Sequence, residues 1–165
     1  MAIPSVSGPY GLLPVGRHVA SMNDLHATFV TAAPFTNERQ IVFDAFVLWK
    51  KHMSELIPQG KIWVNGGFVT HKPWAAPRDI DVAILCKPED LNALDPVGEG
   101  KFRNLMTSHG PGWRRQPMGD LVDAFYVVRG DVPQTLYWDG KWSGVTDKQH
   151  TEVEGLKKGY VEVNL

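Results

Sequence analysis

The stretch WVNGGFVTHKPWAAPRDIDVAIL, residues 63–85, contains a glycine pair and, separated from it by eleven residues, an Asp-Ile-Asp triplet. It lies across two runs, KIWVN (61–65) and IDVAILC (80–86), which are short, apolar and β-branched, as buried strands are. Gly66 and Gly67 follow the first run, and Asp79 and Asp81 begin the second. The stretch therefore predicts two strands joined by a loop that starts with two glycines and ends at two carboxylates.

Helical patterns precede these strands. Ser21 and Asp24 form a capping-box pattern that predicts a short helix through about Val30. A longer helix is predicted to start with Asn37 as its cap and to end before Pro58 and Gly60. Its apolar residues recur at helical spacing and are expected to face the core: Ile41, Ala45, Leu48, Trp49, Met53 and Leu56.

The second half of the sequence adds further strands and short helices. LVDAFYVV (121–128) and GYVEVNL (159–165) are predicted strands, and the segments 88–94 and 98–110 are predicted to contain short helical pieces. HGPGWRR (109–115) is interpreted as a loop. Asp139-Gly140 lies between aromatic residues in TLYWDGKWSGV, which predicts a hairpin with Trp138 and Trp142 packing across its strands. We expect an α+β fold, with a mixed sheet, helices packed on it and a C-terminal hairpin.

Composition limits the kind of protein. With 165 residues and 43% hydrophobic residues, the expectation is a single domain, residues 1–165, whose Pro- and Gly-rich first twenty residues are extended. The net charge of −1 gives no global basic field for non-specific nucleic-acid binding. A single cysteine, Cys86, excludes an intrachain disulfide. No apolar run approaches the ~18 residues that span a bilayer, and there is no signal-peptide pattern, so we expect a cytoplasmic protein without membrane partners.

The aspartates are the strongest candidates for chemistry. In a strand, residues i and i+2 project from one face roughly 6.5–7 Å apart, so Asp79 and Asp81 are expected to share a face. Two like charges this close require a positive charge nearby, and Mg²⁺ or Mn²⁺ suits carboxylate ligands. Asp123 is a third carboxylate in an otherwise apolar strand, where it either pairs with an arginine or joins the metal site. Such a set of three serves phosphoryl or nucleotidyl transfer.

The glycine pair is expected to supply the phosphate side of the same site. Gly66 and Gly67 let the backbone approach a ligand closely, and the amides that follow them can bind phosphate oxygens. Thr70 adds a hydroxyl and Lys72 a positive charge. Arg114 and Arg115, beside Trp113, are interpreted as a solvated turn or, alternatively, as residues that bind a base or a nucleic-acid backbone.

A strand ending in Gly-Gly, then Asp-Ile-Asp, then an isolated strand aspartate resembles the nucleotidyltransferase superfamily typified by DNA polymerase beta. The stretches GLLPVGRHVAS, GGFVTHKP, DIDV and KKGYVEVNL are similar to a family of small, uncharacterised nucleotidyltransferase-like proteins from bacteria and phages. The resemblance implies that Asp79 and Asp81 bind both metal ions. It also implies that Asp123 binds the catalytic metal and orients or deprotonates the acceptor hydroxyl.

The resemblance implies a metal-dependent transfer of a nucleoside monophosphate from an NTP. The resemblance leaves the acceptor open among an RNA 3′ end, a protein hydroxyl and a small molecule, and it is compatible with a role in toxin–antitoxin or phage–host conflict. One departure is Gly67, because many superfamily members have serine there. An alternative is therefore a catalytically inactive protein of the same fold that binds a nucleotide or a protein partner. A third reading treats Asp79 and Asp81 as ordinary charges at a strand edge.

Overall fold

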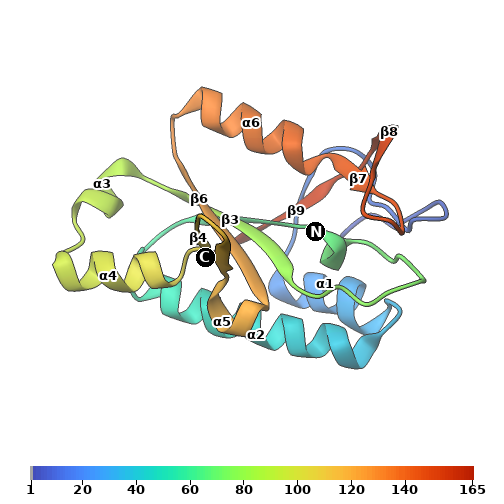
Figure 1. Cartoon of the computed structure of the whole chain (residues 1–165), viewed down its shortest axis with the longest axis horizontal. Helices are drawn as coiled ribbons and strands as arrows, with labels where there is room; N and C mark the ends of the chain where they lie inside the picture. The colour runs from blue at the N-terminus through green and yellow to red at the C-terminus, as the bar shows by residue number, and fades with distance from the viewer. Residues whose placement is uncertain (1) are drawn as a thin grey trace.

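A five-stranded mixed sheet runs through the middle of the molecule (Figure 1). The computed structural model describes residues 2–165. Along the sheet the strands are β1 (Arg17–Val19), β9 (Tyr160–Asn164), β2 (Lys61–Asn65), β3 (Ile80–Cys86) and β6 (Val122–Val128). β2 is antiparallel to β3 and β9, while β1 is parallel to β9 and β3 is parallel to β6. The expected α+β fold with a mixed sheet is confirmed.

One face of the sheet packs against the N-terminal helices. These are α1 (Met22–His26), the π-helical turn η1 (Ala27–Thr31) and α2 (Thr36–Ser54), which lie below the sheet in Figure 1. The predicted capping box is confirmed, because the Ser21 hydroxyl accepts a hydrogen bond from the Asp24 amide and the Asp24 carboxylate accepts one from the Ser21 amide.

The predicted start and buried face of α2 are wrong in part. The helix begins after Phe35, so Asn37 lies within its first turn and is not the cap. Ile41 and Leu48 are 59% and 48% exposed. The buried face instead carries the larger aromatic side chains, which remove more apolar surface from water when they face the sheet. Its buried residues are Arg39, Val42, Phe43, Phe46, Trp49 and Met53.

The other face of the sheet is covered by α6 (Val132–Trp142), which lies above the sheet in Figure 1. The hairpin predicted around Asp139-Gly140 is therefore wrong. Asp131 caps the helix by accepting a hydrogen bond from the Gln134 amide, and Trp138 and Trp142, four residues apart, pack side by side on the same helix face. The C-terminal hairpin does exist, but it is formed later in the chain by β7 (Gly144–Thr146) and β8 (Glu152–Lys157).

The segment between β3 and β6 contains short elements. The predicted helical pieces are present as α3 (Pro88–Asn92) and α4 (Pro96–Asn104). The segment interpreted as a loop forms a hairpin instead, with β4 (Ser108–Gly110) antiparallel to β5 (Trp113–Arg115), because Pro111 and Gly112, which has φ +74°, make a tight turn. An irregular helical turn, α5 (Pro117–Asp120), leads into β6.

Residues 2–20 are mostly irregular, as expected, but they include β1 and the isolated bridges from Leu12 to Ser7 and to Thr70. Within residues 2–165, no helix has both the length and the apolar character that crossing a membrane requires.

Candidate functional site

Two of the three candidate aspartates face each other across adjacent strands. Asp81 on β3 is the register partner of Asp123 on β6, and Asn65 at the end of β2 is the register partner of Asp81 on its other side. Side chains alternate along a strand, so Ile80 and Val82 lie in the core between the sheet and α2, while Asp81 and Ala83 face the α6 side. The sheet therefore brings the predicted carboxylates of β3 and β6 together.

The glycine pair meets the Asp-Ile-Asp triplet in space. Gly66 has φ +75°, a conformation that other residues rarely adopt, and a Cβ atom added there would overlap the carboxylate of Asp81. Gly67 begins the short 3₁₀ turn η2 (Gly67–Val69), and a Cβ atom there would meet only the Pro77 side chain, at 3.8 Å. The two glycines thus have different roles, because only Gly66 makes room for the aspartate.

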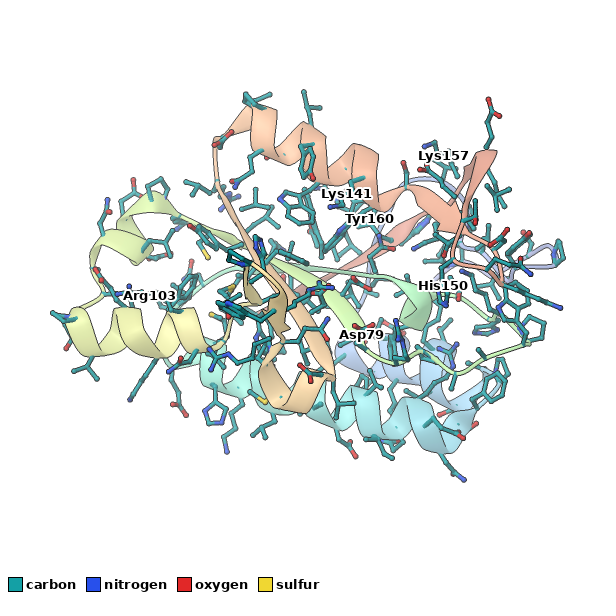
Figure 2. The ribbon with its side chains drawn as sticks, viewed as in Figure 1. Asp79, Arg103, Lys141, His150, Lys157 and Tyr160 are labelled. Carbon is teal, nitrogen blue, oxygen red and sulfur yellow. The ribbon has the colours of Figure 1, made fainter. Side chains whose placement is uncertain are left out.

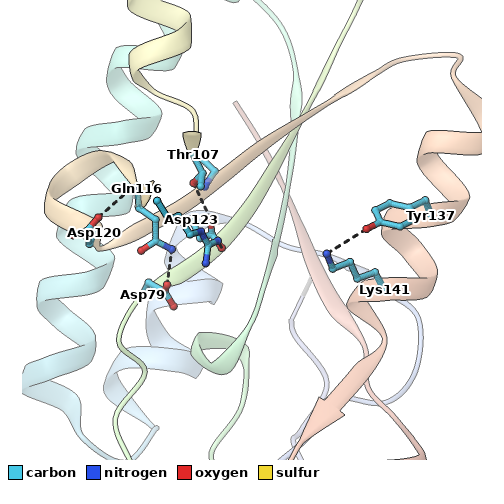
Figure 3. Close-up of polar contacts among 9 residues, drawn as sticks. Asp79, Thr107, Gln116, Asp120, Asp123, Tyr137 and Lys141 are labelled. Atoms are coloured by element: carbon cyan, nitrogen blue, oxygen red, sulfur yellow. Dashed lines mark hydrogen bonds and ion pairs between the residues drawn. The ribbon is translucent and has the colours of Figure 1, made fainter. Parts of the chain in front are cut away.

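The outer carboxylates are held by neighbouring polar side chains (Figure 3). Asp123 is buried; its Oδ1 accepts a hydrogen bond from the Thr107 hydroxyl at 2.7 Å, and its Oδ2 pairs with the Arg114 guanidinium at 2.5 Å. The Gln116 side-chain amide donates to Asp79 at 2.9 Å. Arg114 comes from β5, so the hairpin that the sequence did not indicate positions the arginine partner of Asp123.

The environment of Asp81 disfavours its charge. Burial, together with the nearby carboxylates of Asp79 and Asp123, raises the pKa of Asp81 to about 7, although Lys158 and Arg114 act in the opposite direction. Lys158 and Arg114 offset this repulsion only in part, and a divalent cation bound at Asp81 would remove the rest.

Lys158 is a site residue that the sequence did not reveal. It is 5% exposed, and its ammonium donates to Asn65 Oδ1 and, at 3.4 Å, to the Gly66 carbonyl. Burial lowers the pKa of Lys158 to about 7, and Asp81 opposes this shift. A lysine just before an apolar strand normally indicates a solvated loop. Only the position of β9 inside the sheet places it at the end of β2.

Lys158, Asn65, Gly66 and Asp81 line a cavity of about 410 Å³ between the sheet and α6, here called the main cavity. Its polar part contains Asp81 and Asp123 with the cations Lys72, Arg114 and Lys158. Its other walls include aromatic side chains and Lys141, and Figure 2 shows Lys141 on the side of the sheet that α6 covers. A cavity of this size that mixes carboxylates, cations and rings is typical of a small-molecule site.

The remaining predicted site residues are placed differently. Lys72 reaches across to β7, where its ammonium donates to the Thr146 carbonyl at 2.6 Å. Asp79 lines a second cavity of about 190 Å³ that shares Gly67, Lys72 and Thr146 with the main cavity. Thr70 is 1% exposed and lines neither cavity; its hydroxyl donates to the Gly67 carbonyl at 2.7 Å and thereby braces the glycine turn.

The carboxylates do not form a ready-made metal cage. Within residues 2–165, no three side chains of the His, Cys, Asp and Glu types are grouped so that they could hold a metal ion. Asp123 is engaged by Arg114 and Thr107, and Asp79 by Gln116. Asp120, just before β6, accepts a hydrogen bond from the backbone N–H of Gln116 and lines neither cavity.

Fold and site together define an α+β protein with a glycine-lined cavity, containing both carboxylates and cations, at one end of a mixed sheet. The chain belongs to the family described as "Family of unknown function (DUF6932)", whose model matches residues 6–164. That description assigns no activity. No curated protein and no solved structure is significantly similar to the chain.

Proposed function

We propose that this protein is a metal-dependent nucleotidyltransferase that moves a nucleoside monophosphate from an NTP to an acceptor hydroxyl. The observation that carries the proposal is the meeting of three sequence features at one end of the sheet. Asp81 and Asp123 are register partners, Asp79 is close enough to raise the pKa of Asp81, and the carboxylate of Asp81 lies against Gly66. The surrounding cations suit a triphosphate.

Each residue has a defined part in this reaction. The acceptor oxygen forms a bond to the α-phosphorus, the bond between the α-phosphorus and its bridging oxygen breaks, and pyrophosphate leaves. Asp123 accepts the proton of the acceptor hydroxyl once Arg114 has turned from the carboxylate to the phosphates. Lys72 and Lys158 offset charge on the phosphates. A bound Mg²⁺ or Mn²⁺, held by Asp79 and Asp81 with Asp123, would activate the acceptor hydroxyl and neutralise the leaving pyrophosphate.

Label transfer tests the proposal. Purified protein is incubated with each α-³²P-labelled NTP, Mg²⁺ or Mn²⁺ and a cell extract that supplies RNA, protein and small-molecule acceptors. We expect labelled product from the wild type and a loss of at least 100-fold from the double variant Asp79→Ala/Asp81→Ala. Asp44→Ala, which removes an exposed carboxylate from α2, is the matched control and should retain activity. Absence of label, or label that survives the double substitution, defeats the proposal.

The second candidate function is nucleotide binding without turnover. It is favoured by the ion pair between Arg114 and Asp123, which occupies the carboxylate that would take the acceptor proton. Calorimetry separates the two functions. An NTP that binds with a measurable heat, but yields neither pyrophosphate nor labelled product with any acceptor fraction, would support the binding protein over the enzyme.

A further inference from the structure

One side of the main cavity is aromatic. Phe125 of β6 and Trp138 and Trp142 of α6 line it, and we call these three residues the aromatic wall. The ring centroids of Phe125 and Trp138 are 4.6 Å apart, and those of Trp138 and Trp142 are 5.5 Å apart. Trp138 is only partly buried, and the Lys141 ammonium lies over its ring, 5.5 Å from the ring centroid, so a base that stacks on this ring displaces Lys141 toward the phosphates.

Trp142 has an indole N–H without a protein acceptor. The indoles of two other buried tryptophans are satisfied, Trp49 by the Leu105 carbonyl at 2.7 Å and Trp63 by Glu162 at 3.0 Å. Trp142 is 6% exposed, and its indole N–H donates to no acceptor within residues 2–165. The indole nitrogen keeps some contact with solvent, and Trp142 lines the cavity. Buried indole N–H groups normally have a partner, so the cavity is where an acceptor from a ligand would meet this one.

The Trp142 N–H alone does not distinguish the bases, because every base carries an acceptor, and the side chain of Asn65 is occupied. The Asn65 side chain uses its amide on the Trp142 carbonyl at 2.7 Å and its oxygen on Lys158. Specific readout of a base needs donors and acceptors in a fixed pattern, whereas stacking on a ring accepts any base. The wall therefore offers planar apolar contact with little means of discrimination.

We propose that the aromatic wall binds the base of the nucleotide by stacking on Trp138 and accepts all four bases with similar affinity. The triphosphate then extends toward Lys72, Arg114 and Lys158. This inference rests on the proposed function, because it names the substrate contacts of the same cavity. It goes beyond that function in assigning α6 the role of base recognition.

Calorimetric titration in Mg²⁺ tests the wall without requiring turnover. ATP and inorganic tripolyphosphate are titrated into the wild type, Trp138→Ala, Trp138→Phe and Leu136→Ala. Leu136 lies on the same helix, is 64% exposed and does not line the cavity, so it is the matched control. We expect Trp138→Ala to weaken ATP about tenfold or more, Trp138→Phe to weaken it less, and neither to change tripolyphosphate. ATP, GTP, CTP and UTP should bind the wild type within about tenfold of one another.

Several results would overturn the inference. The first is that Trp138→Ala loses affinity for ATP and for tripolyphosphate equally. The second is that Trp138→Ala binds ATP as tightly as the wild type does. The third is that the wild type binds ATP no more tightly than tripolyphosphate. The last comparison needs no variant and holds even if Trp138→Ala fails to fold. Failure of the transferase proposal would look different. If the nucleotides bind as expected but no label is transferred, the proposed reaction is wrong and the proposed base site stands.

Discussion

Gly66 and Gly67 are neighbours in the sequence with different surroundings in the fold. Gly66 combines a positive φ with direct contact to the Asp81 carboxylate, whereas Gly67 has free space where a side chain would project. We expect Gly66→Ala to lower the free energy of unfolding by at least ~2 kcal/mol, because strain and overlap add. Gly67→Ser should change it by less than ~1 kcal/mol. Urea denaturation of the two variants makes the comparison.

Gly67→Ser also bears on the proposed function, because many members of the superfamily that this sequence resembles carry serine at this position. The structure has room for the serine that many members carry, so the substitution should leave nucleotide binding intact or strengthen it. Similar destabilisation by the two substitutions would contradict the different roles assigned to the two glycines.

Asp81 should make the stability of the protein depend on pH. Its pKa is raised to about 7 from a value near 3.8 in the unfolded chain. Between these values the folded state binds more protons than the unfolded state, so the free energy of unfolding falls as pH rises from about 4 to about 7. Asp81→Asn cannot ionise. We expect it to be more stable than the wild type by ~1–3 kcal/mol at pH 8 and close to the wild type at pH 4.

The wild type and Asp81→Asn must be compared at the same pH, because Lys158 makes the free energy of unfolding change with pH in the opposite direction. Its pKa is lowered to about 7 from 10.5, so the unfolded state binds more protons over that range and stability rises with pH there. Urea denaturation at pH 4.5 and pH 8, with Asp44→Asn as control, measures the effect. A stability difference that is the same at the two pH values would exclude Asp81 as its source.

At the scale of elements, Arg39 joins α2 to the glycine turn. It is fully buried and donates hydrogen bonds to the carbonyls of Phe29, Pro34, Phe68 and Thr70, at 2.6–3.0 Å. Burial lowers the pKa of Arg39 to about 10, so the guanidinium stays charged at neutral pH. No carboxylate is among these hydrogen-bond partners. Four backbone carbonyls, two before α2 and two in the glycine turn, therefore hold the charge.

Removing this guanidinium should loosen the turn that carries Gly66 and Gly67. We expect Arg39→Met to cost ~3 kcal/mol or more of unfolding free energy, because four carbonyls lose their donor. Arg39→Lys should recover part of the loss, since one ammonium cannot reach all four. Arg103→Met, on the exposed face of α4, should cost less than ~0.5 kcal/mol. Thermal denaturation with far-UV circular dichroism tests the series. Equal melting temperatures for the two methionine variants would rule out the role assigned to Arg39.

Elements were predictable where one pattern dominated. The bounds of β2 and β3 follow from their short apolar runs, and the Ser21–Asp24 capping box marks the start of α1. In α2, two apolar faces at helical spacing compete, and packing against the sheet favours Val42, Phe46 and Trp49 over Ile41 and Leu48. In α6, Asp139-Gly140 resembles a turn, but Asp131 provides a cap and the Trp138–Trp142 pair needs a helix to pack together.

At the scale of the molecule, the site could be predicted as far as its residues lie in one local stretch. Gly66, Asp79 and Asp81 lie within sixteen residues of one another, and Asp123 followed from a charge in an apolar strand. Lys158 and Arg114 are long-range neighbours, joined to the site by strand order and by a hairpin. No local pattern encodes a contact between residues 65 and 158, so sequence reasoning could not find it.

β9 makes the whole sheet depend on a late segment. It lies between β1 and β2 and pairs with them through Tyr160–Asn164, while Lys158 enters the cavity just before it. We expect a chain shortened after Lys157 to lose cooperative unfolding, because β1 loses its strand partner β9 and β2 exposes an unpaired edge. A shortened chain that still melts in one sharp transition would contradict this. Removing residues 2–6, which lie before the first bridge and contribute only the partly buried Ile3 and Val6 to the core, is the control and should leave unfolding cooperative.

The same arrangement has a consequence for biosynthesis. While the ribosome is still adding residues before 160, β2, β3 and β6 can already pair, but β2 presents an open edge and its polar end lacks Lys158. The nascent chain therefore passes through a stage that is prone to strand-to-strand association and has an incomplete cavity. β9 follows the other strands of this sheet in the chain and both protects that edge and supplies Lys158, so the cavity stays incomplete until the sheet is closed.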